Sequence, residues 1–416
     1  MSTESKILTF AITNQTKNSE NNITPPVIKK IPKELRRKKF KADISLSWYK
    51  RFVDRLKNDS QFFRSSVQLA FVLLCLWIGI EFYLFMKWGM SEGTASYFER
   101  PPGVEGFLPI SALMGLLHWI FSGTLNTIHP AATIILIAII AVSIVMKKAF
   151  CSWMCPIGTL SESLWMLGQQ LFKKNITVWK WLDYPLRSLK YLLLLFFTYS
   201  IAMMSVDDLN VFINSPYNKV ADIKMYLFFA EISSFALWTI IILMLASVVI
   251  KNFWCRFLCP YGALLGLAGL VSPFRITRVI ETCIDCELCT KVCPSNIKVH
   301  QIGQANSNNT IGHVWSDECT SCMRCVEECP VKETLVLRSR LNETVGQATK
   351  KSVSVSPFVF GSLIVGVFIA ITGLGILTGH WHNSVSKDEY QFRFQQMDSP
   401  LYNHARGSVP QYGPND

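Results

Sequence analysis

The sequence predicts a mainly α-helical, polytopic membrane protein of about five transmembrane helices, built as a parallel two-fold repeat, with a small α+β domain inserted. Three observations support this fold class. Half of the 416 residues are hydrophobic and only 17% are charged, against about 25% charged in an ordinary soluble domain. One sequence pattern occurs twice, 104 residues apart. Finally, all but one of the thirteen cysteines fall into four compact groups.

Residues 1–65 are predicted to form a basic, cytoplasmic N-terminal arm. Eight lysines and arginines fall within positions 29–41. Beside a membrane span, such a run fixes topology or touches anionic lipid more often than it binds nucleic acid. Membrane lipid is therefore an expected partner and nucleic acid is not. A short helix is expected from about Trp48 to Lys57, just before the first span.

Five segments are long and apolar enough to cross about 30 Å of hydrocarbon, which takes roughly 20 residues. These predicted spans are 66–88, 128–146, 188–205, 225–250 and 356–378. A shorter apolar stretch, 107–123, is interrupted by Pro109, Gly115 and Gly123. It is expected to form an interfacial or re-entrant helix.

The charges that flank these segments predict their orientation. Lys147 and Lys148 follow the second span and Lys251 follows the fourth, which indicates that both spans end in the cytoplasm. The loops 89–106 and 206–222 carry acidic residues and are expected outside. The predicted topology, in a bacterial inner membrane, has its N-terminus inside and its C-terminus outside.

Two matched cysteine runs lie in residues 280–335. The first is Cys283-x2-Cys286-x2-Cys289-x3-Cys293-Pro294, and the second is Cys319-x2-Cys322-x2-Cys325-x3-Cys329-Pro330. This is the spacing of bacterial ferredoxins with two 4Fe–4S clusters, in which the fourth cysteine of each run binds the other cluster. Zinc would be expected of a single pair, but eight cysteines in two copies favour iron and sulfide.

The spacing therefore predicts two ligand sets that exchange their last members. Cys283, Cys286, Cys289 and Cys329 are expected to hold one cluster, and Cys319, Cys322, Cys325 and Cys293 the other. Free thiolates persist in a reducing compartment, so this domain is expected in the cytoplasm.

The repeated pattern is C-x3-C-P-x-G-x-L, seen at Cys151–Leu160 and again at Cys255–Leu264. Each copy follows a span that is predicted to run from outside to inside, so the two copies are expected to be parallel repeats. The prolines suit the first turn of a new helix. Three interpretations of Cys151, Cys155, Cys255 and Cys259 remain open: a further iron–sulfur or metal site, a dithiol redox pair, or small buried residues at a helix junction.

The predicted domains follow from these motifs. The arm is followed by a four-span membrane domain at 66–279, a ferredoxin-type domain at 280–335, a linker with the fifth helix at 336–379, and an extracytoplasmic tail at 380–416.

Several residues are weaker candidates. Glu81 and Glu231 fall inside predicted spans, where a carboxyl is costly and is a functional candidate by default; either could accept a proton from a quinol. His118 and His129 are expected near the outer surface, where they could bind a quinol head group or a metal, although capping or interface roles are commoner. His380 and His382 form an H-x-H pair that could bind copper or haem, although an exposed polar tail is commoner.

The chain resembles the membrane polyferredoxins, a family with NapH, NosR and CcoG/FixG branches. The likeness rests on the two C-x3-C-P motifs, at Cys151–Pro156 and Cys255–Pro260, and on the dicluster motif at 283–330. It covers roughly residues 66–335. The flavin-binding domain of the NosR branch and the immunoglobulin-like domain of the CcoG branch have no counterpart here, and the NapH branch lacks the basic arm and the fifth span.

The resemblance implies a membrane-bound electron-transfer protein that relays electrons between a quinol or another donor and a respiratory or redox protein partner. It would be an electron-transfer subunit resembling a quinol dehydrogenase. Two other functions fit the residues: a maturation factor that reduces a metal ion such as copper for a respiratory enzyme, and a redox sensor that signals through the basic arm. The sequence does not identify the donor, the acceptor or the direction of electron flow.

Overall fold

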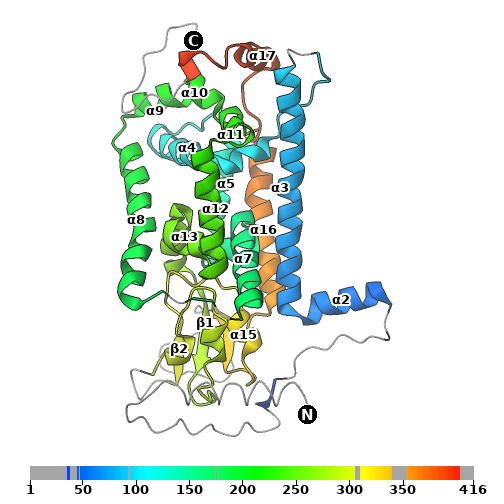
Figure 1. Ribbon diagram of the computed structural model, residues 1–416, viewed down its shortest axis with the longest axis vertical. Coiled ribbons are helices and arrows are strands. Elements are labelled where there is room, and N and C mark those ends of the chain that lie inside the picture. Colours follow the sequence, from blue (N-terminus) through cyan, green and yellow to red (C-terminus); the bar gives the residue numbers. More distant parts are fainter. Residues whose placement is uncertain are drawn as a thin grey trace.

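The computed structural model shows a bundle of helices with a small sheet-containing domain at one end of its long axis (Figure 1). The residues that the structure describes are 35–37, 45, 47–91, 94–173, 175–176, 178–304, 310–339 and 354–402. The tail beyond residue 402 and most of the basic arm therefore lie outside the described residues. The predicted mainly helical fold with a small α+β domain is confirmed.

Two helices are long and apolar enough to cross a membrane in the part of the chain that the structure describes. They are α3 (Ser60–Met90) and α16 (Pro357–Leu377), and they run along the long axis of the molecule (Figure 1). They correspond to the first and fifth predicted spans. Asp59 starts α3 by accepting hydrogen bonds from the amides of Gln61 and Phe62, and Ser356 caps α16 in the same way.

Two further spans are possible if each of two bent helix pairs crosses as a unit. One pair is α8 (Lys180–Ala202) with α9 (Val206–Ile213), bent by 101°. The other is α11 (Ala221–Ala230) with α12 (Ser234–Val249), bent by 83°. The predicted span over 225–250 therefore consists of two helices that meet at a sharp bend. Ser233 caps a new helix at this point, and an average of hydropathy over many residues does not detect such a corner.

Helix α5 (Pro130–Met146) occupies the second predicted span but has 17 residues, short of the roughly 20 that a span requires. It packs against α16 and against α4 (Pro109–Ser122), the helix expected to be interfacial or re-entrant. That five segments cross the membrane therefore stays a prediction.

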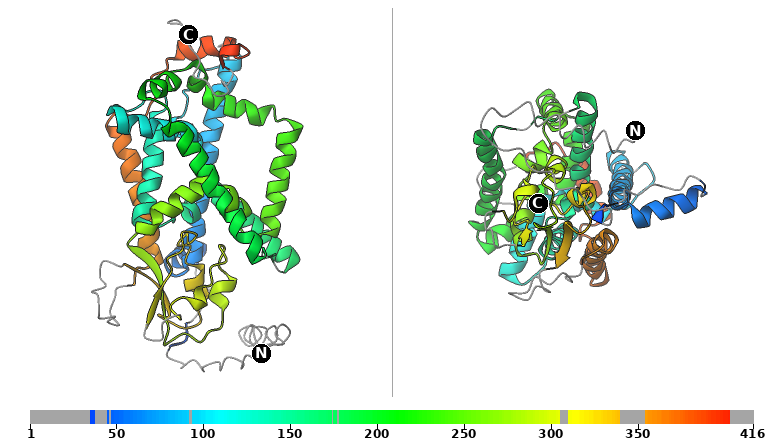
Figure 2. Two further views of the ribbon diagram at one scale, coloured as in Figure 1. Left: turned by 90° about the vertical axis from the view of Figure 1, so that its left-hand side faces the viewer. Right: turned by 90° about the horizontal axis from the view of Figure 1, so that it is seen from below.

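The shorter elements connect these helices. They are α2 (Trp48–Asn58), η2 (Pro102–Phe107), α6 (Phe150–Trp153), α7 (Pro156–Phe172), α10 (Pro216–Lys219), η3 (Trp254–Leu258), α13 (Pro260–Ala268), η4 (Gly269–Val271), α17 (Lys387–Gln395) and η7 (Pro400–Tyr402). Helix α2 is the juxtamembrane helix expected from the sequence. It projects sideways from the lower end of α3, away from the rest of the molecule (Figures 1 and 2).

The small domain contains an antiparallel sheet of order β2-β1-β3. Its strands are β1 (Phe274–Val279), β2 (Ile311–His313) and β3 (Leu335–Ser339), with Thr277 opposite His313 and Ile276 opposite Leu337. Three one-turn helices, α14 (Leu288–Lys291), η5 (Val299–Gln301) and α15 (Arg324–Glu328), complete it. The sheet thus uses residues on both sides of 280–335.

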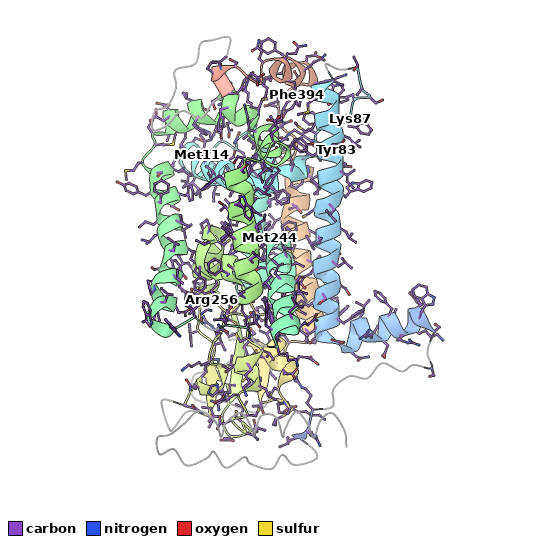
Figure 3. All side chains as sticks on the ribbon, viewed as in Figure 1. Tyr83, Lys87, Met114, Met244, Arg256 and Phe394 are labelled. Atoms are coloured by element: carbon purple, nitrogen blue, oxygen red, sulfur yellow. The ribbon has the colours of Figure 1, made fainter. Side chains whose placement is uncertain are left out.

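One hydrophobic core joins this domain to the helices. Ile276, Leu335 and Leu337 of the sheet belong to the same buried cluster as Met146 at the end of α5 and Phe360 of α16. At the same boundary, Arg256 of η3 forms an ion pair with Asp183 of α8 at 2.6 Å. Figure 3 shows Arg256 at the lower end of the helical part, next to the small domain. The two parts are therefore packed together and are not joined only by a linker.

The opposite end of the bundle brings together the two loops that are predicted to lie outside the membrane. Arg100 pairs with Glu105, at 2.8 Å, and with Asp222. His129 lies 3.5 Å from Glu105, and its other ring nitrogen lies 2.6 Å from the carbonyl oxygen of Asn218. All four charged or titratable side chains are buried, so this network fixes η2 and α5 to the start of α11.

Candidate metal centres

The eight cysteines of the small domain line two separate cavities. Cys283, Cys286, Cys289 and Cys329 line the first cysteine cavity, of about 350 Å³. Cys293, Cys319, Cys322 and Cys325 line the second cysteine cavity, of about 380 Å³. The backbone thus groups the cysteines as the crossed spacing predicts, with the last cysteine of each run in the cavity of the other run.

Matched backbone conformations shape both cavities. Asp285 and Glu287 of the first run have φ values of 51° and 58°, and Ser321 and Met323 occupy the same positions of the second run with 49° and 58°. Left-handed residues other than glycine are costly, so finding four at matched positions indicates a specific local requirement. Such turns direct successive backbone N–H groups to one side, which suits a negatively charged group.

Burial favours the neutral form of several thiols in this domain. Burial raises the pKa of both Cys289 and Cys293 to about 12, and it also raises the pKa of Cys286, Cys322 and Cys329. Because a metal binds the thiolate, loading must release these protons and contribute to folding. Among the described residues, no group of three or more His, Cys, Asp or Glu side chains is arranged to hold a single metal ion.

The four cysteines of the repeated motif also meet. Cys151, Cys155, Cys255 and Cys259 all line one cavity of about 1770 Å³, the membrane cysteine cavity. None of the four is in a disulfide. All three interpretations of these cysteines, including small buried residues at a helix junction, therefore stay open at this point.

Each half of the membrane cysteine cavity has the same local geometry. Pro156 and Pro260 start helices α7 and α13, as expected. Immediately before them, the sulfur atoms of Cys155 and Cys259 accept hydrogen bonds from the amides of Gly158 and Gly262, at 3.4 and 3.3 Å. The motif thus places one cysteine sulfur at the positive end of each helix, where a thiolate is favoured.

In each copy of the motif, the glycine lets the start of the helix pack closely against the backbone carbonyl of the first cysteine. A Cβ atom on Gly158 would lie 2.1 Å from the carbonyl oxygen of Cys151, and one on Gly262 would lie 3.1 Å from that of Cys255. We therefore expect Gly158→Ala to destabilise the protein by about 1–3 kcal/mol through overpacking, and Gly262→Ala by less. Gly366→Ala in α16, where no atom lies within 4 Å, is the control. Thermal unfolding in detergent would rank the three variants by their midpoint temperatures. Equal midpoints for all three would contradict the prediction.

The second cysteine cavity is adjacent to the membrane cysteine cavity. Cys322, Pro294, Ser295 and Thr320 line both. Ser152, next to Cys151, donates a 2.7 Å hydrogen bond to the carbonyl of Thr320, and Trp153 donates to that of Ser321. These two hydrogen bonds therefore connect α6, which contains Cys151, to the loop that carries Cys319 and Cys322.

Buried charges lie along this boundary. Glu318 forms an ion pair with Lys190 and lies 3.8 Å from Lys148, and both Lys148 and Glu318 line the membrane cysteine cavity. Next to Glu318, Asp317 accepts a hydrogen bond from Tyr191 of α8, and this bond and the two lysines hold the pKa of the Asp317 carboxyl below its usual value. The sequence analysis treated Lys148 only as a topology signal and missed Glu318 and Lys190.

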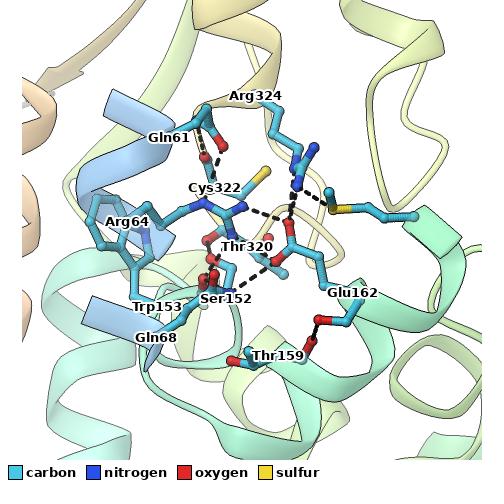
Figure 4. A network of polar contacts seen from close by, with 12 residues as sticks. Gln61, Arg64, Gln68, Ser152, Trp153, Thr159, Glu162, Thr320, Cys322 and Arg324 are labelled. Atoms are coloured by element: carbon cyan, nitrogen blue, oxygen red, sulfur yellow. Dashed lines mark hydrogen bonds and ion pairs between the residues drawn. The ribbon is translucent and has the colours of Figure 1, made fainter. Parts of the chain in front are cut away.

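A second network of polar contacts connects α3 and α7 to the ferredoxin domain (Figure 4). Arg64 donates two hydrogen bonds to Glu162 of α7, at 2.8 and 2.5 Å, and one to the carbonyl of Ser152. Arg324 of α15 pairs with the same carboxylate, and Gln61 donates to the carbonyl of Cys322 at 3.1 Å. Arg64 is almost fully buried, and nothing in the sequence indicated its partner.

The weaker candidates lie elsewhere. Glu81 accepts a hydrogen bond from Trp77 on the surface of α3, and Glu231 is an exposed residue at the break between α11 and α12, not inside a helix. Neither lines the membrane cysteine cavity. His118 is buried with its ring 3.2 Å from the carbonyl of Thr124, His129 belongs to the buried network described above, and both His380 and His382 are exposed.

Comparison with known proteins agrees with these sites. A family model described as a 4Fe–4S binding domain matches residues 128–175 and again 232–278, and each match contains one C-x3-C-P motif. A second model, described as a 4Fe–4S dicluster domain, matches residues 275–330. No solved structure matches the chain.

Three relatives illustrate the breadth of the likeness. YccM of Escherichia coli (strain K12), whose name refers to electron transport, is 39% identical over 82% of this chain and 91% of that protein. The ferredoxin-type protein NapH of Haemophilus influenzae is 26% identical over 49% of this chain and 67% of its own. NirI of Paracoccus denitrificans is 26% identical over 54% of this chain and 31% of its own. These findings show that the chain is a ferredoxin-type protein that carries 4Fe–4S clusters.

Proposed function

Because this chain belongs to the membrane polyferredoxin-like family, we propose that it relays electrons across the boundary between the membrane and its ferredoxin domain. Bound 4Fe–4S clusters supply the one-electron carriers for such a relay. The observation that supports this role most directly is that Cys322 and its neighbours line both the second cysteine cavity and the membrane cysteine cavity.

We assign the ligands by cavity. Cys283, Cys286, Cys289 and Cys329 hold the first cluster, and Cys293, Cys319, Cys322 and Cys325 hold the second. For Cys151, Cys155, Cys255 and Cys259 we favour a third iron–sulfur site, because these four thiols face one cavity from two matched helix starts and the family model over each motif is itself that of a 4Fe–4S binding domain.

A quinol is the donor that the membrane cysteine cavity suits best. Part of its wall is apolar and includes Phe107, Ile139, Leu193 and Phe197, as expected for a site that takes an apolar ring and tail. Glu318 in the same wall, held by Lys148 and Lys190, is better placed to accept a proton than either Glu81 or Glu231.

The proposed topology follows the charge pattern. Helix α2 and the ferredoxin domain lie at one end of the molecule, and α17 lies at the other end (Figure 1). With the ferredoxin domain in the cytoplasm, α3 and α16 and the two bent pairs cross the inner membrane, α5 is the fifth and shortest span, and the chain's C-terminal side faces outward. The acceptor is then a soluble redox protein that reaches the first cluster from the cytoplasm.

The test uses anaerobically purified protein with its clusters and a reduced, water-soluble quinol analogue. We expect the analogue to reduce the clusters, seen as loss of visible absorbance and as new EPR signals. The variant Cys151→Ala/Cys255→Ala should lose about four iron atoms per chain if a third cluster is present, and its ferredoxin clusters should no longer be reduced by the analogue. An unchanged iron content with unchanged reduction would exclude a role for the membrane cysteines, and unreduced wild-type clusters would exclude quinol as donor.

A further inference from the structure

Residues 35–37 of the basic arm form backbone hydrogen bonds with the ferredoxin domain. The amide of Arg37 donates a 2.8 Å hydrogen bond to the carbonyl of Pro330, and the amide of Lys332 donates one of 2.8 Å to the carbonyl of Leu35. Arg36 and Val331 form the antiparallel bridge between these bonds. Pro330 and Val331 line the first cysteine cavity, so residues 35–37 pair with the segment that forms its wall.

This pairing brings a positive charge to the first cysteine cavity. The guanidinium of Arg37 donates to the carbonyl oxygen of Val326, which precedes Cys329 by three residues. Cys329, Pro330 and Val331 line the first cysteine cavity, so this contact places the positive charge beside the segment that forms the cavity wall. The acceptor of the Arg37 guanidinium is an uncharged carbonyl, so this hydrogen bond leaves its charge in place.

The second cysteine cavity has a similar arginine in a different electrostatic state. Arg64 also comes from the N-terminal side of the chain, but its guanidinium is paired in a two-bond contact with the carboxylate of Glu162. Arg324 shares this carboxylate. The positive charge beside the second cavity is therefore reduced by an ion pair, although it is not cancelled.

We propose that residues 35–37 belong to the first cluster's binding site and that Arg37 is a positioning residue that stabilises the reduced state of this cluster. The proposal rests on the ligand sets assigned above. A 4Fe–4S cluster becomes more negative by one charge on reduction, so a nearby cation favours the reduced form and raises the midpoint potential. The arm, which the sequence suggested as a topology signal, a lipid contact or a signalling segment, thereby controls how readily the first cluster takes an electron.

The experiment is an EPR-monitored redox titration of the full chain with its clusters, with iron and sulfide measured on the same samples. Arg37→Gln keeps a hydrogen-bond donor and removes the charge, so the midpoint of one ferredoxin cluster should fall while the other does not move. Arg37→Lys should restore it. Arg55→Gln on α2, whose side chain lies over the ring of Phe62, removes a charge away from the cavity and should leave both midpoints unchanged.

Two outcomes would overturn the proposal: unchanged midpoints in Arg37→Gln protein with full iron content, or an equal shift in Arg55→Gln. Selective loss of one cluster from Arg37→Gln would support it, because the arm would then be needed to hold that cluster. A further combination separates this proposal from the ligand assignment. In protein that also carries Cys283→Ser/Cys329→Ser, the second cluster should be the one ferredoxin cluster that remains, and Arg37→Gln should not move its midpoint. A shift of that midpoint would show that the ligand sets are wrong.

Discussion

The double variant Cys283→Ser/Cys329→Ser is expected to keep one intact 4Fe–4S cluster in the ferredoxin domain, whereas Cys293→Ser/Cys329→Ser should lose both. Cys283 and Cys329 come from different sequence runs but line the same cavity, so the first pair of changes damages one ligand set twice. The second pair removes one ligand from each set, since Cys293 lines the other cavity. The first variant should therefore lose about half of the iron in the ferredoxin domain, and the second should lose nearly all of it.

Iron and sulfide assays, together with counting of spins by EPR, would measure this difference. The single variant Cys75→Ser is the control, because this cysteine lies outside both ferredoxin cavities. If each run held its own cluster, Cys283→Ser/Cys329→Ser would instead lose both clusters. A third variant, Cys319→Ser/Cys329→Ser, would then keep one, whereas the crossed ligand sets predict that it loses both.

Glu162→Ala is expected to weaken the attachment of the ferredoxin domain to the helices by about 3 kcal/mol, because it leaves a buried charge without its partner. Arg64 has 1% of its side chain exposed and depends on this carboxylate, and Arg324 of the ferredoxin domain pairs with the same oxygen atoms. The contribution of Arg324, with 21% exposed, is smaller because solvent screens it.

Thermal unfolding followed by tryptophan fluorescence, and limited proteolysis of the native protein, would detect this change. The midpoint should fall and cleavage should begin near the boundary of the ferredoxin domain. Glu231→Ala removes the same side chain from an exposed position and should leave both measurements unchanged. Equal behaviour of the two variants would show that the Figure 4 network contributes little to docking.

Motifs that concern neighbouring residues were predictable from the sequence. The cysteine spacings indicated which thiols share a cavity, and Pro156 and Pro260 indicated helix starts, because these features depend on local backbone geometry. The break at Glu231 was not predictable from hydropathy. Apolar residues continue on both sides of it, and only the cap at Ser233 and the buried pairing of Asp222 with Arg100 show where the chain turns.

Contacts between segments that are far apart in the chain could not be predicted from the sequence either. Lys148 looked like a flanking charge, but its position beside Glu318 depends on how the ferredoxin loop packs against α5 and α6. In the same way, Arg64 sits at the start of an apolar helix, where a basic residue is ordinary, and its partner Glu162 lies 98 positions later. A single sequence contains no signal that connects such residues.

The exchange of Cys293 and Cys329 between cavities has a consequence for biosynthesis. Cys329 is the last of the thirteen cysteines to leave the ribosome, yet it completes a site whose other three thiols appeared much earlier. With the ligand sets proposed above, neither cysteine run can complete a cluster site by itself, so both sites become complete only once the second run has been synthesised.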